Sequence, residues 1–236
     1  MKRVMISFGL AMVVVIFVPF GHAVGQGTLQ LGPYYQKNGN TYIVGPNLAG
    51  GLTGLYLLQV LAQIDDASAD NPYLIKLKPG VYDLGNDSGP PIGTKLVMKS
   101  YVDIEGSGTN VTRIYGRVLD DPTIEFLVAM ERSSEIRSLT LEFDGDGKNI
   151  ACALDDMYLG GSGSSPARIT NVDIRVYGAN VNIGIELQND TIVSDVNVLL
   201  EDSAEENWGI WCPYGFSTPP IIDNARVTVR NAVENL

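Results

Sequence analysis

The strongest constraint on the fold of this 236-residue chain is an internal repeat that begins at Ile136. One template occurs four times: an apolar residue, two polar residues, and then apolar residues at every second position. Its copies are Ile136–Phe143, Ile169–Val176, Val193–Leu200 and Ile222–Val229. A second apolar segment follows each of the first three copies, at Ile150–Leu154, Ile183–Leu187 and Trp208–Cys212. Apolar residues at every second position are typical of β-strands, so we expect a strand at each segment.

The length of the repeat distinguishes between the known classes of repeat proteins. Equivalent positions of the first set lie 33, 24 and 29 residues apart, and periods of about 20–50 residues indicate a solenoid or a similar array. A propeller blade needs four antiparallel strands and about 40 residues, and helical repeats need helices between the copies. We therefore predict an all-β fold, a right-handed parallel β-helix with two or three strands in each coil.

Stacking of the coils predicts two columns of interior side chains. The first column is Leu139, Val172, Val196 and Ala225, and the second is Ile150, Ile183 and Trp208. The residue before each core strand is small and polar, namely Ser138, Asn171, Asp195 and Asn224. Such residues tolerate left-handed backbone conformations, so we expect them to occupy the bends between sheets.

The same register separates the two cysteines. Cys152 aligns with Ile185 and Ile210, whereas Cys212 aligns with Leu187. The cysteines then lie two coils apart, about 10 Å at one strand spacing per coil, which exceeds the reach of a disulfide. We therefore predict two buried free thiols.

Residues 1–23 have the parts of a signal peptide. Lys2 and Arg3 precede an apolar run that extends to Phe20, and Ala23 ends a segment of small residues suited to cleavage. A membrane anchor is the alternative, but the run is near the lower length limit for a spanning helix and contains Pro19. The pattern predicts a secreted protein, either extracellular or periplasmic.

The rest of the chain divides into a leader and one repeat domain. Residues 24–50 read as a leader or an irregular first strand, and residues 51–236 as the β-helix domain. A helix is expected at about 53–65, with Thr53 as its N-cap. Its apolar stripe contains Leu57, Leu58, Leu61 and Ile64. An amphipathic helix in front of a stack of strands is expected to cap the first open end.

Charge and histidine content exclude several functions. Cleavage after Ala23 leaves 14 basic and 27 acidic residues, a net charge of −13. An acidic surface repels nucleic acids and anionic membranes, so neither is expected as a partner of the mature protein. The only histidine, His22, leaves with the signal peptide. This excludes serine–histidine–aspartate triads and zinc sites that depend on histidine.

The first coils resemble a known superfamily. Leu74–Leu84 contains a strand and a Pro-Gly-Val-Tyr turn, and it is followed by Tyr101–Gly108 and Thr112–Ile114. These segments resemble the opening coils of the pectin lyase-like superfamily, in particular pectinesterases and exported bacterial right-handed β-helix proteins. The resemblance implies the fold more strongly than an activity, because this fold hosts lyases, hydrolases, esterases and proteins without activity.

The catalytic motifs of these relatives are absent from the sequence. No segment matches the pectinesterase nucleophile motif, and the histidine-containing motifs of polygalacturonases and pectate lyases are missing as well. Catalytic residues therefore stay unknown. We expect an exported protein that binds polysaccharide or a cell-surface partner. The alternatives are a carbohydrate-active enzyme of the pectinesterase type and a purely structural stalk.

Metal binding has one weak candidate. Asp144 and Asp146, near Glu142, resemble half of a calcium loop, but Lys148 occupies the position where a third oxygen ligand is expected. No cofactor is expected otherwise, and calcium is kept as a candidate.

Outward-facing residues are the candidates for binding. On the second strand of each coil, the small column Ala151, Gly184 and Gly209, with Ala153 beside it, suggests a shallow outward trough. Glu186 and Trp211 would stand next to it, and an exposed indole is a platform for a sugar ring. On the first strand the candidates are Asp173, Arg175 and Arg226, because arginine recognises carboxylates.

The last coil is expected to have an open end. Leu236 follows closely on the last core strand, with no helix to cover it. An uncovered coil exposes apolar side chains and strand edges. We therefore expect either a longer parent chain or a second copy of this chain as the partner at this end.

Overall fold

A computed structural model describes residues 29–30, 35–48, 53–85, 95–117, 125–156, 163–212, 218–231 and 234–235. The strands of the described residues form two sheets. The first sheet contains β1 (Leu29–Gln30), β2 (Tyr35–Asn38), β3 (Thr41–Val44), β4 (Tyr73–Leu77), β5 (Gly80–Asp83), β7 (Val102–Glu105), β8 (Thr112–Arg117), β10 (Glu135–Asp144), β12 (Arg168–Tyr177), β14 (Ile192–Glu201) and β16 (Ile221–Arg230). The second sheet contains β6 (Leu96–Val97), β9 (Glu125–Ala129), β11 (Ile150–Asp155), β13 (Val181–Glu186), β15 (Glu206–Trp211) and β17 (Glu234–Asn235).

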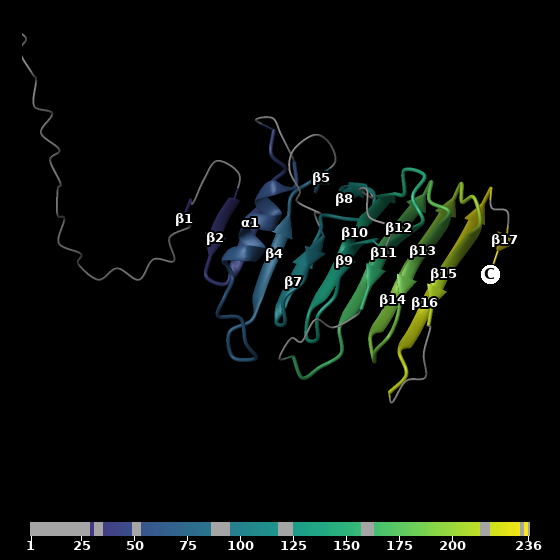
Figure 1. Ribbon diagram of the computed structural model, residues 1–236. Helices are drawn as coiled ribbons and strands as arrows, with labels where there is room; N and C mark the ends of the chain where they lie inside the picture. The colour runs from purple at the N-terminus through teal and green to yellow at the C-terminus, as the bar shows by residue number, and fades with distance from the viewer. Residues whose placement is uncertain are drawn as a thin grey trace, which may run out of the picture.

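The strands stack as the coils of a right-handed parallel β-helix. The order β10-β12-β14-β16 in the first sheet and β11-β13-β15-β17 in the second places successive coils side by side. Figure 1 shows this stack, from β4 to β16, with the strand edges aligned. All neighbouring strands are parallel except in β1–β2–β3, which is antiparallel. The predicted fold class is thus confirmed.

The bends of the first sheet lie where the sequence predicts them. Ser138, Asn171, Asp195 and Asn224 have φ of 57°, 53°, 55° and 50°, which is the left-handed region. The Asn224 side chain donates a hydrogen bond to the Asp195 carboxylate at 2.5 Å, and Asn171 donates to the Ser138 hydroxyl at 3.3 Å. Short polar side chains accept this conformation at low cost. Each bend therefore turns a strand without breaking the parallel ladder.

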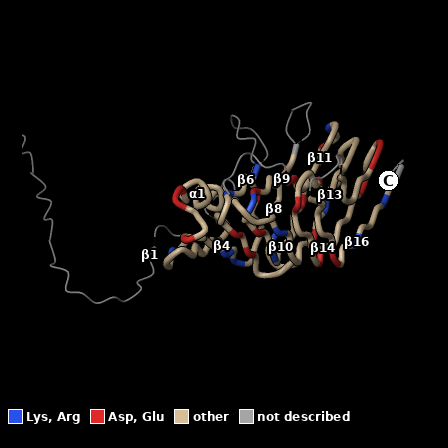
Figure 2. The backbone as a smooth tube through the Cα atoms, turned by 90° about the horizontal axis from the view of Figure 1, so that it is seen from below, with Lys and Arg blue, Asp and Glu red and all other residues tan. Residues whose placement is uncertain are grey.

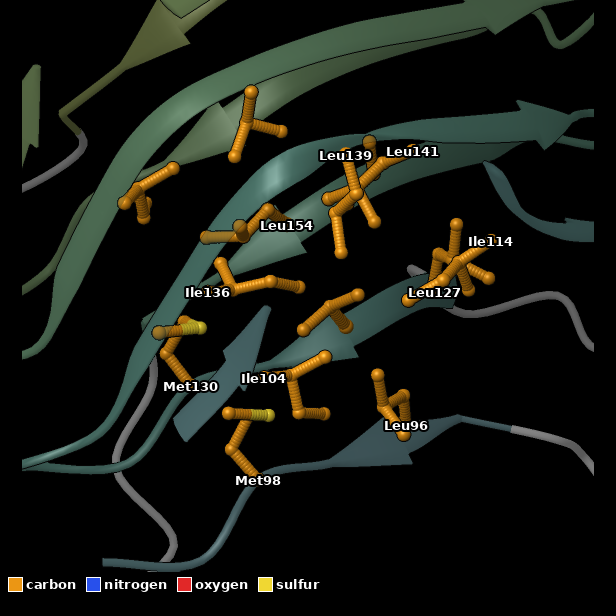
Figure 3. Packing of buried hydrophobic residues seen from close by; sticks show 14 of the residues in the cluster. Leu96, Met98, Ile104, Ile114, Leu127, Met130, Ile136, Leu139, Leu141 and Leu154 are labelled. Carbon is orange, nitrogen blue, oxygen red and sulfur yellow. The ribbon is translucent and has the colours of Figure 1, made fainter. Parts of the chain in front are cut away.

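The predicted register of the first column is confirmed, but its last member, Ala225, is exposed on β16 and not in the interior. Leu139 pairs with Val172, Val172 with Val196, and Val196 with Ala225. Figure 3 shows Leu139 and Leu141 of β10 directed toward Leu127 and Leu154 of the second sheet. Because the two sheets lie close together, these side chains fill the interior from both walls, and they are almost completely buried.

One helix, α1 (Leu55–Gln63), lies at the N-terminal end of the stack, where it packs against β3 and β5. It buries Leu57, Val60 and Leu61. The prediction of Thr53 as N-cap is wrong, because the cap position is Gly54 and makes no side-chain hydrogen bond. The Thr53 hydroxyl instead accepts the Asp83 N–H at 2.7 Å, which ties the start of the helix to β5.

The C-terminal end of the helix is bound by a lysine from a later coil. The Lys99 Nζ donates to the carbonyl oxygens of Ala62 and Ile64 at 3.3 and 2.5 Å. A cation is favourable beside the free carbonyls at the end of a helix. Among the described residues, no helix is long and apolar enough to cross a bilayer.

In the second sheet, the predicted register and the predicted inward and outward faces are wrong. Cys152, not Ile150, pairs with Ile183 and so joins the column of Trp208, while Ile150 pairs with Val181. Side chains of Ala151 and Ala153 belong to the buried core. A Cβ added at Gly184 would lie 2.4 Å from the Val198 Cγ1 of the opposite sheet. The small column therefore faces the interior, and the predicted outward trough does not exist.

The small residues have a physical reason for facing inward. The two sheets approach closely here, so alanine and glycine leave the space that the valines of β14 and β16 occupy. The Cβ of a residue at Gly209 would likewise meet Val227 at 2.4 Å. Both cysteines are free, but only Cys152 is buried, and Cys212 is exposed. The prediction of two buried thiols is thus wrong for Cys212.

The last long strand exposes apolar side chains. Ile221, Ile222 and Val227 of β16 are 58%, 45% and 44% exposed. The residues equivalent to Ile222 and Val227 on β12 and β14 are buried, whereas Ile221 aligns with the half-buried Ile192 and the exposed Arg168. These apolar side chains are thus exposed at the C-terminal end of the described stack. That a partner covers β16 stays a prediction.

Candidate functional site

A groove of about 530 Å³ runs over the outward face of β12, β14 and β16. We call it the β12–β16 groove, and its polar and apolar lining includes Asp173, Arg175, Asn197, Leu199, Arg226 and Arg230. It lies on the second half of each strand, beyond the left-handed bend. Three of the residues predicted for binding, Asp173, Arg175 and Arg226, are thus brought together in one cleft.

The strand register orders the groove into columns. Asp173 on β12 pairs with Asn197 on β14, which pairs with Arg226 on β16. The neighbouring column is Arg175, Leu199 and Thr228. In a parallel sheet, residues two apart on a strand point to the same face. The interior residues Ile174 and Val198 between the columns hold the strands in place from below.

Two of the arginines share one carboxylate. The Arg175 Nε donates to the Glu201 Oε2 at 2.8 Å, and the Arg230 Nη1 lies 3.4 Å from Glu201 Oε1. The Arg175 guanidinium also lies over the ring of Tyr177, 4.9 Å from its centroid. These contacts fix the position of Arg175 and leave its Nη atoms without a partner among the described residues.

Arg226 differs from the other two arginines. It is exposed, and among the described residues it makes no hydrogen bond or ion pair. Asn197 next to it donates its amide N–H to the Asp173 carboxylate at 2.9 Å, so its amide oxygen faces away from that bond. Figure 2 shows acidic and basic residues interspersed along the coils. The groove thus concentrates three arginines on an acidic protein.

Glu186 and Trp211 lie elsewhere. They pair with each other on β13 and β15 of the second sheet, and neither lines the groove. Glu186 is only 4% exposed, and the Trp211 ring packs against Trp208 with centroids 4.6 Å apart. The structure therefore separates the five predicted binding residues into a group of three and a group of two. Binding at the second group stays a prediction.

The carboxyl groups of Asp155, Asp156 and Glu186 form a cluster of three. Asp155 pairs with Glu186 in register, and Asp156 follows on the same strand end. Asp156 accepts the backbone N–H groups of Gln188 and Asn189 at 2.5 and 3.2 Å, which shapes the loop after β13. All three are almost completely buried. Burial keeps them from a polysaccharide, so they are weaker candidates for binding than the groove.

Burial raises the pKa of Glu186 above its ordinary value of 4.5, the nearby Asp156 carboxylate adds to the rise, and the hydrogen bond from Gln188 opposes it. A raised carboxyl pKa means that the folded state prefers the protonated form. Glu186 therefore destabilises the fold at neutral pH, and this penalty disappears as the pH falls through the raised pKa toward 4.5.

We expect Glu186→Gln to raise the free energy of unfolding near pH 7, because the amide carries no charge to bury. At about pH 4 the variant and the natural protein should have equal stability. Urea unfolding at both pH values measures this, with Glu205→Gln, an exposed change between β14 and β15, as the control. A variant that is less stable near pH 7 would contradict the expectation.

The calcium candidates are engaged with arginine. Asp144 Oδ2 lies 3.2 Å from the Arg117 Nε, and Asp144 Oδ1 accepts the Asp146 N–H at 3.0 Å. Glu142 is paired with Arg113 at 2.7 Å. Among the described residues, no group of three acidic, histidine or cysteine side chains has a metal-binding arrangement. Calcium at Asp144 and Asp146 stays a prediction.

No family model and no curated protein matches the sequence of this chain. Two solved structures are similar, the A-modules of the mannuronan C-5 epimerases AlgE6 and AlgE4 of Azotobacter vinelandii. Each is 15% identical, with TM-scores of 0.38 and 0.36. The matches cover 73% and 75% of this chain, and 58% and 72% of the modules. At this identity the likeness concerns the fold alone.

Proposed function

We propose that this protein is an exported β-helix protein that binds a polysaccharide bearing carboxylate groups in the β12–β16 groove. The observation that carries the proposal is Arg226, an exposed arginine without a partner in the described part of the chain, at the side of a cleft. The planar guanidinium presents paired donors that match a carboxylate.

The shape of the groove supports a polymeric ligand. It crosses β12, β14 and β16 and is open on its outer side, so an extended chain can lie along the stack. Polar groups alternate with the apolar Leu199.

The arginines of the groove offset the acidic charge of the protein locally. With a formal net charge of −11 for the whole chain, the protein as a whole repels a polyanion. Arg175, Arg226 and Arg230 line the groove with Asp173, and Glu201 pairs with Arg175 and Arg230. Three cations against two carboxylates leave one net positive charge at the groove. An anionic ligand is therefore directed to this face of the solenoid.

We expect Arg226→Gln to weaken binding of polygalacturonate about tenfold or more, because a charge-assisted hydrogen bond contributes about 1.5–3 kcal/mol. Titration calorimetry at low salt measures the dissociation constant. The matched control is Arg168→Gln, which removes the same charge from an exposed position on β12 outside the groove.

Two outcomes would contradict the proposal. Equal weakening by both changes would indicate attraction by overall charge and not by the groove. Failure of the natural protein to bind any acidic polysaccharide, with a normal unfolding transition, would remove the function altogether.

A further inference from the structure

The cations of the groove lie on alternate coils of the stack. Arg175 lies on β12, and Arg226 and Arg230 lie on β16, with β14 between them. Neighbouring strands are about 4.8 Å apart, so the two levels differ by about 10 Å along the axis of the solenoid. Charge is therefore offered at every second coil.

The intervening coil offers no charge to the groove. Its lining residues on β14 are Asn197, Val198 and Leu199. The amide of Asn197 suits a hydroxyl or an acetamido group, and the half-buried Leu199 suits the apolar face of a ring. This level of the groove matches an uncharged sugar.

Asp173 disfavours a ligand that carries a carboxylate on every sugar. Its carboxylate lines the same groove, one strand from Asn197 and two strands from Arg226. The Asp173 carboxylate accepts the Asn197 amide N–H at 2.9 Å, so it lies beside the β14 level of the groove. A carboxylate on the sugar at that level would meet a like charge, and such contacts lower the affinity for the wrong ligand. An uncharged sugar at the β14 level avoids this contact.

Arg175 is held ready for the second carboxylate. Glu201 binds its Nε, and the ring of Tyr177 supports its plane. The backbone of Glu201 is itself fixed, because its carbonyl accepts the buried Asn182 amide at 2.8 Å. The contacts with Glu201 and Tyr177 therefore orient the Nη atoms of Arg175 in the absence of a ligand.

From this spacing we propose that the ligand is a polysaccharide with a disaccharide repeat, in which a carboxylated sugar alternates with an uncharged one. The inference rests on the proposed function and specifies its ligand. In an extended chain of six-membered sugar rings, one sugar advances about as far as one coil. Alternate sugars then meet Arg175 and Arg226, and the sugar between them meets Asn197 and Leu199.

Three hexasaccharides test the proposal by titration calorimetry on the purified protein. One alternates glucuronate with N-acetylglucosamine, one is uniform galacturonate, and one is uniform N-acetylglucosamine. We expect the alternating hexasaccharide to bind at least tenfold more tightly than either uniform one. Arg175→Gln and Arg226→Gln should each weaken it about tenfold, and Asp173→Asn should narrow its advantage over galacturonate.

The outcomes separate this inference from the proposed function. If galacturonate binds as tightly as the alternating ligand and Arg226→Gln weakens both, the groove binds carboxylated glycans but the alternation is wrong. If none of the ligands binds, or if Arg226→Gln changes nothing, the proposed function itself is wrong. Thermal unfolding of each variant confirms that the fold is intact.

Discussion

Gly184→Ala is expected to lower the free energy of unfolding by about 2 kcal/mol. The new Cβ would lie 2.4 Å from the Val198 Cγ1 and 2.5 Å from the carbonyl oxygen of Gly209. Val198 is buried in the interior, and the other contact is backbone, so neither atom can move away. Overpacking of a dense core costs about 1–3 kcal/mol.

Gly209→Ala, one coil further along, is the matched comparison. Its Cβ would meet only the side chain of Val227, which is 44% exposed on β16 and can turn aside. We expect less than half of the loss seen at Gly184. Urea unfolding followed by circular dichroism measures both. A Gly184→Ala variant as stable as the natural protein would mean that this strand face points to solvent, as the alternation in the sequence suggests.

Asn182→Leu is expected to lower the free energy of unfolding by on the order of 3 kcal/mol. Asn182 is completely buried at the corner between the sheets. Its amide donates to the Glu201 carbonyl at 2.8 Å and to the Asn207 Oδ1 at 3.0 Å, and its oxygen accepts the Ala179 N–H at 3.1 Å. Leucine fills the space but leaves these groups unpaired, at about 1–3 kcal/mol for each buried group.

The double variant Asn182→Leu/Asn207→Leu tests the cause. Removing Asn207 as well eliminates one of the unpaired groups, so the combined loss should be smaller than the sum of the single losses. Asn180→Ala is the control, because the side chain of Asn180 makes only an exposed contact of 3.5 Å with Asn149. Strict additivity would argue that the two asparagines are not coupled. The Asn182 amide also binds the Glu201 carbonyl, and Glu201 in turn holds Arg175. Loss of the Asn182 hydrogen bonds should therefore make the position of Arg175 in the groove less fixed.

The repeat strands of the first sheet, β10, β12, β14 and β16, could be predicted from the sequence. Their template contains the bend residue, so the polar positions at Ser138, Asn171, Asp195 and Asn224 determine both the register and the inward face. Once the register was known, alternation placed Asp173, Arg175 and Arg226 on the outward side. That pattern also implied that they share one face.

The second sheet could not be predicted in the same way. Its segments have apolar residues on both faces, as in Ile150–Leu154, so alternation does not identify the inward side. The distance to the opposite wall decides it. Only small side chains such as Ala153 and Gly184 fit at the positions that face the valines of the first sheet, since a Cβ at Gly184 would lie 2.4 Å from Val198.

The repeat by itself therefore determined the parallel β-helix and the outward-facing residues of its first sheet. The alternation of apolar residues and the polar bend residues that indicate them lie next to each other in the sequence. Only the tertiary structure decided that Glu186 is buried, that Trp211 lies away from the groove, and that Glu201 joins Arg175 to Arg230. Those facts depend on how closely the two walls approach and on contacts between different coils, which no single segment contains.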